Sequence, residues 1–174
     1  MKMTFKIMFA KVAFFSALVA GLTLASACNG NTEISSDEAK AAALAVVPGT
    51  VESSLAALED TLPVYEVKVR LSTGSAIYVW VHRGDGALYG MEDEIGPFEY
   101  ELAAPQQGLL SYSAAKAKAF AVKQGTQVAW NLKNKDGGFR HEFYVRDTAG
   151  QLWEVKLKST TGETISVEAK DAVD

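Results

Sequence analysis

The chain has very few of the residues that form disulfides or bind metals. Its 174 residues include one cysteine, Cys28, and two histidines, His82 and His141. A single cysteine excludes an internal disulfide. Neither histidine has a cysteine, aspartate or glutamate at metal-ligand spacing, so we expect each to be a strand-surface residue with a local hydrogen bond. Because no nucleophile–base pair, cofactor motif or ligand cluster is visible, the sequence predicts no enzyme, no metal and no cofactor.

Basic residues are also scarce. The whole chain has 17 Lys and Arg against 21 Asp and Glu, and residues 28–174 keep only 14 of the basic residues and all of the acids, a net charge of −7. Binding to nucleic acid needs clustered Lys and Arg, so this class of partner is not expected. The balance favours solubility or a basic protein partner.

Long apolar runs are missing except near the start. Three lysines, Lys2, Lys6 and Lys11, lead into the apolar run 12–24, which ends in the small residues 25–27. This pattern is typical of a secretory signal peptide and is too short for a stable membrane span. We therefore assign residues 1–27 as a signal peptide and expect an exported protein.

The position of Cys28 directly after that segment is informative. The sequence Leu24-Ala25-Ser26-Ala27-Cys28 resembles a bacterial lipoprotein box, although its leucine lies four residues before the cysteine in place of three. This resemblance implies lipid attachment at Cys28, membrane contact through the N-terminal lipid and, with Asn29 next, an outer-membrane or periplasmic lipoprotein. Cleavage by the ordinary signal peptidase, giving a secreted or periplasmic soluble protein, is the alternative.

The remaining chain repeats itself without a gap. Residues 34–93 and 110–169, compared at an offset of 76, share 17 identities in 60 pairs, where ordinary residue usage gives roughly four. The shared residues include glycines, valines and alanines in helix-like, turn-like and strand-like stretches. Duplication of one structural unit is the simplest account.

Each repeat begins with an Ala- and Lys-rich stretch typical of a helix, capped by Ser35 with Glu38 in the first copy and by a serine in the second. Gly49 and Gly125 are expected to end these helices in the left-handed conformation. Three strand-like runs follow each helix, joined by glycine turns. The predicted fold class is α+β, with two tandem modules at 34–93 and 110–170, each one helix packed on a small antiparallel sheet. Residues 94–109, with five acids in or beside them, read as a linker, and the alternative of a calcium site at 92–94 lacks the required spacing.

Both repeats resemble the PepSY domain. The first copy carries the resemblance in "EAKAAALAVVPGTV", "VYEVKV" and the turn glycines Gly74 and Gly86, and the second in "AAKAKAFAVKQGT", "HEFYVR", Gly150 and Gly162. The second departs at Arg140-His141, where the first has Val64-Tyr65. The resemblance implies a small PepSY- or cystatin-like helix-plus-sheet module that binds other proteins and often restrains a peptidase.

The third predicted strand of each copy differs on one face. Ile77, Val79 and Val81 match Trp153, Val155 and Leu157 and should face the helix, because alternate residues of a strand share a face. The opposite face carries Glu154, Lys156 and Lys158 in the second copy, which we expect to be solvated. The first copy has Tyr78, Trp80 and His82 there, which something must cover. Trp130 and Trp153 are expected in the second core, each with an acceptor for its indole N–H.

Two explanations of this aromatic face stay open. The second module or the linker packs on it, or it is a platform for a protein partner, since Tyr and Trp dominate interface hot spots. The candidate partner-binding face is Tyr78, Trp80 and His82, with Glu66, Lys68 and Arg70 as a polar rim. We expect an exported protein that binds or inhibits a secreted or envelope peptidase; the alternative is a structural or sensor-accessory lipoprotein that binds a small ligand or wall component in a groove between helix and sheet.

Overall fold

The structure is a computed structural model that describes residues 33–93, 96–104, 106–135 and 137–173. The described residues belong to one compact unit, Asn31–Asp174. The predicted signal peptide and Cys28 lie outside the described residues.

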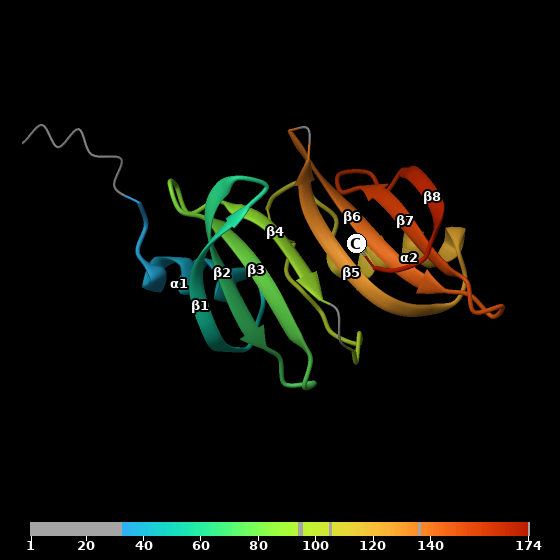
Figure 1. Cartoon of the computed structure of the whole chain (residues 1–174), viewed down its shortest axis with the longest axis horizontal. Coiled ribbons are helices and arrows are strands. Elements are labelled where there is room, and N and C mark those ends of the chain that lie inside the picture. Colours follow the sequence, from blue (N-terminus) through green and yellow to red (C-terminus); the bar gives the residue numbers. More distant parts are fainter. Residues whose placement is uncertain (1–32, 94–95, 105, 136, 174) are drawn as a thin grey trace, which may run out of the picture. The chain divides into compact units, whose positions relative to one another are not determined.

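Two helices and eight strands make up this unit (Figure 1). Their order and bounds are α1 Ser36–Val46, β1 Thr50–Glu59, β2 Leu62–Arg70, β3 Ala76–His82, β4 Leu88–Asp93, α2 Tyr112–Val122, β5 Thr126–Lys135, β6 Gly138–Arg146, β7 Leu152–Lys158 and β8 Thr164–Lys170. Each element of the second half begins 76 residues after its counterpart in the first. This is the spacing of the sequence identities.

The eight strands form one antiparallel sheet in the order β1 to β8. The prediction of two separate helix-on-sheet modules is therefore wrong: β4 pairs directly with β5, with Gly90 opposite Lys133 and Met91 opposite Leu132. Separate modules would each leave a strand edge with unpaired backbone groups at this point, and joining them satisfies those groups. The domain boundaries drawn from the sequence stay predictions.

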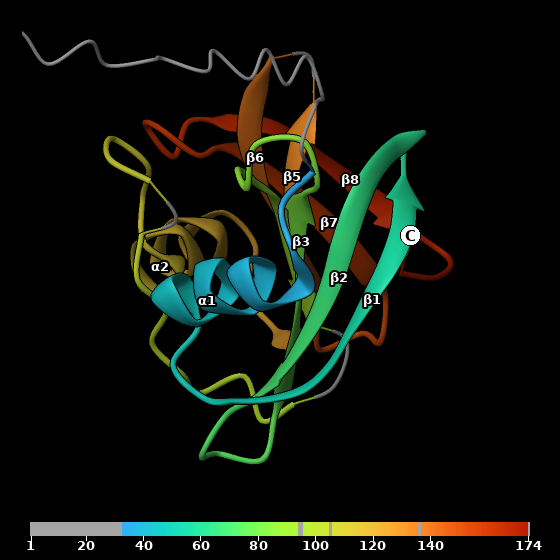
Figure 2. The same ribbon diagram turned by 90° about the vertical axis from the view of Figure 1, so that its left-hand side faces the viewer.

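Both helices lie on the same side of the sheet (Figure 2). A single hydrophobic core joins them, because Ala39 and Ala43 of α1 and Ala115 and Ala119 of α2 belong to one cluster of buried residues. Ile77, Val79 and Val81 of β3 and Val155 and Leu157 of β7 belong to the same cluster, as their spacing predicted. We call this the inner face of the sheet and the opposite face the outer face.

The ends of the helices are similar in the two halves. Ser35 and Glu38 form the predicted capping box, and the Ser111 side chain accepts from the backbone N–H of Ala114. The predicted reason for Gly49 and Gly125 is wrong, because the C-caps of both helices are extended. A Cβ at Gly49 would overlap the carbonyl oxygen of Arg70, and a Cβ at Gly125 that of Arg146. Glycine is needed here for close approach of two backbone segments.

The segment predicted as a linker contributes to the core. Tyr100 and Leu102 are buried, and the Tyr100 ring stacks on that of Tyr112 with centroids 4.6 Å apart. The single hydroxyl hydrogen of Tyr112 is shared between the carbonyl oxygen of Phe98 at 3.2 Å and Oε1 of Gln127 at 3.0 Å. Aromatic packing thus fixes this segment along α2.

Candidate functional site

The outer face of the first half holds the six residues predicted as a partner-binding face. Antiparallel pairing of β2 with β3 sets Glu66 opposite Trp80 and Lys68 opposite Tyr78. His82 lies opposite Val64, and Arg70 opposite Ala76. The six side chains therefore share one face, although their role in binding stays a prediction.

Trp80 is buried within this face, with 6% of its surface exposed. It pairs with Gly90 of β4, and a Cβ at Gly90 would come within 2.9 Å of the indole atom Cε3. The ring therefore lies over this glycine, and its N–H donates to Glu66 at 3.4 Å. Because the ring is covered inside the chain, it is not available as an exposed anchor for a partner.

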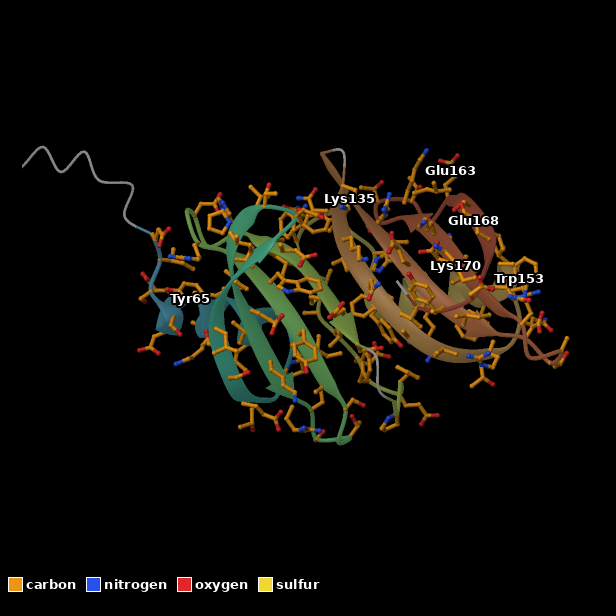
Figure 3. All side chains as sticks on the ribbon, viewed as in Figure 1. Tyr65, Lys135, Trp153, Glu163, Glu168 and Lys170 are labelled. Carbon is orange, nitrogen blue, oxygen red and sulfur yellow. The ribbon has the colours of Figure 1, made fainter. Side chains whose placement is uncertain are left out.

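The turn between β1 and β2 contacts the last residue of β5. Asp60 in the turn forms an ion pair with Lys135, which is labelled in Figure 3, and accepts from the Tyr89 hydroxyl at 3.4 Å. Lys135 lowers the pKa of Asp60 through this hydrogen bond and its charge. Asp60 and Thr61 both have positive φ, 48° and 75°, a conformation that is unfavourable for threonine in particular. This ion pair links the two halves of the chain.

Tyr78 is the accessible aromatic residue of this face. It is half-buried, and the Lys68 ammonium lies over its ring at 5.5 Å. Glu52 joins Lys68 at 3.3 Å and Arg70 at 2.7 Å, and the Arg70 side chain lowers the pKa of Glu52. Glu52 thus holds two of the three predicted rim residues, Lys68 and Arg70, in place. We call Glu52, Lys68, Arg70 and Tyr78 the Glu52 cluster.

The outer face of the second half carries charged residues, but Glu154, one of the three predicted to be solvated, is only 1% exposed. Glu142, for which no such prediction was made, is 2% exposed. Lys156 and Lys170 lie 2.7 and 3.3 Å from Glu154, and the Tyr144 hydroxyl donates to it at 2.9 Å. Burial acts to raise the pKa of Glu154, but these partners outweigh it and the pKa is lowered. Glu154 is therefore paired with two cations.

Glu142 has the same arrangement. Arg140 Nε lies 2.6 Å from this carboxylate and Lys133 Nζ 3.6 Å from it. The prediction of a solvated face holds for Lys158, which is exposed and pairs with Glu163 in the turn between β7 and β8; Glu163 is labelled in Figure 3. Two cations for each buried acid leave this face with an excess of positive charge at its surface.

The two histidines differ. His82 is half-buried and forms the expected local contact, Nδ1 to Asp85 at 2.8 Å. His141 is buried in the core, so its predicted surface position is wrong; its Nδ1 accepts from the Trp130 indole N–H at 3.2 Å. Burial lowers the pKa of His141 to about 4, against a smaller opposite effect of the Leu110 backbone. His141 is therefore neutral at neutral pH.

The indole N–H groups of Trp130 and Trp153 have hydrogen-bond acceptors, as predicted. Trp130 is fully buried and donates to His141. Trp153 is half-buried at the end of the sheet, donates to Asp147 at 2.8 Å and has the Lys123 ammonium 3.8 Å from its ring centroid. Only Trp130 fills the core as predicted.

A groove of about 690 Å³ lies between α2 and the segment 98–101. It is lined by four aromatic side chains and by charged or small ones: Phe98, Tyr100, Tyr112, Phe120, Lys116, Glu99, Glu101, Ser113 and Ala117. Lys116 donates to the Phe98 carbonyl oxygen at 2.9 Å and lies over the rings of Tyr112 and Phe120. Its volume is that of a small-molecule site. No pattern in the sequence predicts this groove, because four of its nine lining residues come from the segment predicted as a linker.

Comparison with known families decides what the first half is. The family model described as "Peptidase propeptide and YPEB domain", PepSY, matches residues 33–87. Residues 33–87 are therefore similar to the PepSY domain. The resemblance is thus confirmed for this segment, which spans α1 to the turn before β4; residues 110–170 lie outside the matched range of the PepSY model.

The comparisons with solved structures and with curated proteins do not identify the second half. A solved structure, of a "putative lipoprotein" from Clostridium difficile 630, aligns with 69% of this chain and 82% of its own, with 13% identity and a TM-score of 0.36. No curated protein matches the chain significantly. Among the described residues, no helix is long and apolar enough to cross a membrane, and no group of three or more His, Cys, Asp or Glu side chains is placed to hold a metal ion.

Proposed function

We propose that this protein is an exported binding protein of the bacterial envelope whose PepSY domain binds a peptidase and restrains it. The PepSY match over residues 33–87 is the observation that carries the proposal. The signal-like start of the chain and the lipoprotein-like sequence ending at Cys28 support export and a lipid anchor. The protein works by binding and not by catalysis.

The Glu52 cluster is the part of the predicted face that suits a partner best. Arg70 is exposed, and Tyr78 offers a ring edge beside the Lys68 ammonium. Ion pairs already hold these side chains in place, so little conformational entropy is lost when a partner binds. Trp80 lies beneath this surface and contributes by keeping it rigid.

The test is inhibition of purified extracytoplasmic peptidases from the same cell, together with direct binding of the same enzymes. Arg70→Ala is expected to weaken binding about tenfold, a loss typical of an interface residue. Arg146→Ala is the matched control, because Arg146 is also exposed and donates to the Gly150 carbonyl oxygen as Arg70 donates to that of Gly74. Equal effects of the two variants, or no inhibition by the unchanged protein, would contradict the proposal.

The groove beside α2 favours a second candidate function, binding of a small ligand or wall component. It lies between a helix and the segment 98–101, and not between helix and sheet as we had expected. Its four aromatic rings suit the apolar faces of a sugar or a peptide side chain, and its charged residues can orient polar groups.

Soluble fragments of cell-wall glycan with their stem peptides are the probe for this second function. Binding is expected to raise the unfolding temperature, and Lys116→Ala is expected to abolish most of that shift. Lys118→Ala, on the same helix but outside the groove lining, is the control. An equal shift in both variants would exclude the groove as the site.

A further inference from the structure

The exposed apolar side chains of this protein gather at the two edges of the sheet. Seven large apolar residues are strongly exposed in the described part of the chain, and five of them lie in the hairpin of β1 and β2 or in β8: Leu55, Leu58, Leu62, Ile165 and Val167. Within the described residues, β1 pairs only with β2, and β8 only with β7. Such edges offer unpaired backbone groups to another strand.

The junction inside the chain shows how these edges can be joined. β4 pairs with β5 there, and the strands that correspond to them at the spacing of 76 residues are β8 and β1. β8 therefore occupies in the second half the place of β4, and β1 occupies in the first half the place of β5. The free edges are the counterparts of the two strands already joined.

We propose that copies of this chain associate end to end, with β8 of one copy pairing with β1 of the next in the register that joins β4 to β5. Transferred to these strands, the pair Met91 and Leu132 becomes Val167 opposite Ala56 of the next copy, and the pair Glu92 and Asn131 becomes Glu168 opposite Leu55. One residue beyond the internal ladder, Ile165 lies opposite Leu58.

This register brings the exposed apolar residues together. Leu58 is 72% exposed and Ile165 49% exposed, and a directly opposed pair buries both side chains and contributes to pairing. A register shifted by one residue would set Val167 against Ala57, whose side chain points to the other face. The pairing is therefore specific in register as well as in direction.

The contact is weaker than the internal junction. Ser54 and Ala56 of β1 stand at the positions of Trp130 and Leu132 of β5, which are fully buried, so less apolar surface is removed from water. A bulge between Val51 and Ser53 also interrupts β1. Association is consequently reversible and depends on concentration, and because it is head to tail it extends to further copies.

Cysteine cross-linking tests this register directly. The full chain, as exported and carrying Cys28→Ser, is made once with Ala56→Cys and once with Val167→Cys, with tags of different size. Mixing the two variants under mild oxidation is expected to give a cross-linked heterodimer. A single chain that carries both substitutions is expected to give a ladder of multimers. Ala57→Cys in place of Ala56→Cys is the control and is expected to give about tenfold less product. Equal yields from the two positions would overturn the proposal.

A second measurement does not depend on cysteines. Val167→Lys is expected to shift the sedimentation of the otherwise unchanged protein toward the monomer at high concentration. Val122→Lys, at a similarly exposed apolar residue on α2, is expected to leave it unchanged. A monomer at all concentrations, or an assembly unaffected by Val167→Lys, would overturn the proposal. No peptidase is present, so the result is independent of the proposed function.

Discussion

The outer faces of the two halves bury different positions of the repeat, and by different chemistry. Trp80 lies over Gly90 in the first half, while Lys156 and Glu154 stand at the positions of Trp80 and Tyr78 in the second. Glu154 is nevertheless as inaccessible as Trp80, because two lysines and the Tyr144 hydroxyl surround it. On this face a charged residue does not indicate exposure, and an aromatic residue does not indicate a binding site.

The strands β1 and β5 differ for a reason that the sheet supplies. Trp130 and Leu132 of β5 are covered by strands on both sides, and Ser54 and Ala56 take their places on the free edge β1. Small and polar residues suit an edge that must not associate tightly. The two strands thus differ where their neighbours differ.

The largest expected loss of stability comes from two substitutions that test whether the two halves are equivalent just after their helices. Gly49→Ala and Gly125→Ala each place a Cβ against a backbone carbonyl oxygen that cannot move aside easily. Each variant is expected to lose about 4 kcal/mol of unfolding free energy, measured by urea denaturation. A large loss in one half and a small one in the other would break the equivalence.

Trp80→Ala comes next and separates burial from binding. Because the ring is buried over Gly90, its removal is expected to cost about 3 kcal/mol of unfolding free energy. Tyr78→Ala, at the half-buried neighbour on the same strand and face, is expected to cost less than about 1 kcal/mol. Similar losses from the two variants would show that the ring of Trp80 is not the covered one.

The pH dependence of stability distinguishes the two histidines. In the unfolded chain His141 takes up a proton near pH 6.5, but in the folded protein only near pH 4. Between these values the unfolded state binds more protons, so stability is full above pH 6.5 and falls as the pH drops to 4, by about 3 kcal/mol at most.

His141→Gln keeps an acceptor for the Trp130 N–H. In this variant the midpoint of urea unfolding is expected to change little with pH across this window. His82→Gln leaves the buried histidine in place and should retain the slope. The same pH dependence in the unchanged protein and in His141→Gln would show that His141 is not the group responsible.

The smallest effect concerns the turn that joins the halves through Asp60 and Lys135. Thr61 has a φ of 75°, and Gly137 has a φ of 78° at the equivalent position of the second half. Thr61→Gly is expected to raise the unfolding free energy by about 1 kcal/mol, because glycine adopts this conformation without strain. Gly137→Thr should lower the unfolding free energy by a similar amount. A lower melting temperature for Thr61→Gly, or a higher one for Gly137→Thr, would refute the explanation.

Local patterns in the sequence predicted much of the secondary structure. The Ser35 and Glu38 capping box and the inner-face residues Ile77 and Val79 are set by spacing within a few residues. The turn glycines have the positive φ that a hairpin needs: Gly74, Gly86, Gly150 and Gly162. Such features depend on neighbours along the chain, so they can be inferred without the fold.

Long-range features could not be inferred in this way. The pairing of β4 with β5 leaves no local signal, because an internal strand and an edge strand alternate alike. The ion pair of Asp60 with Lys135 joins residues 75 positions apart, and the burial of Glu154 depends on Lys170 from the next strand. The sequence therefore predicted that Tyr78, Trp80 and His82 share a face, but it did not predict that Trp80 packs on Gly90 of β4.

The direct ladder from β4 to β5 leaves no hinge between the PepSY domain and the rest of the described chain. A partner that holds the first half and a ligand that fills the groove beside α2 would act on a single cooperative body. Either one alone is expected to protect backbone amides from hydrogen exchange across all eight strands.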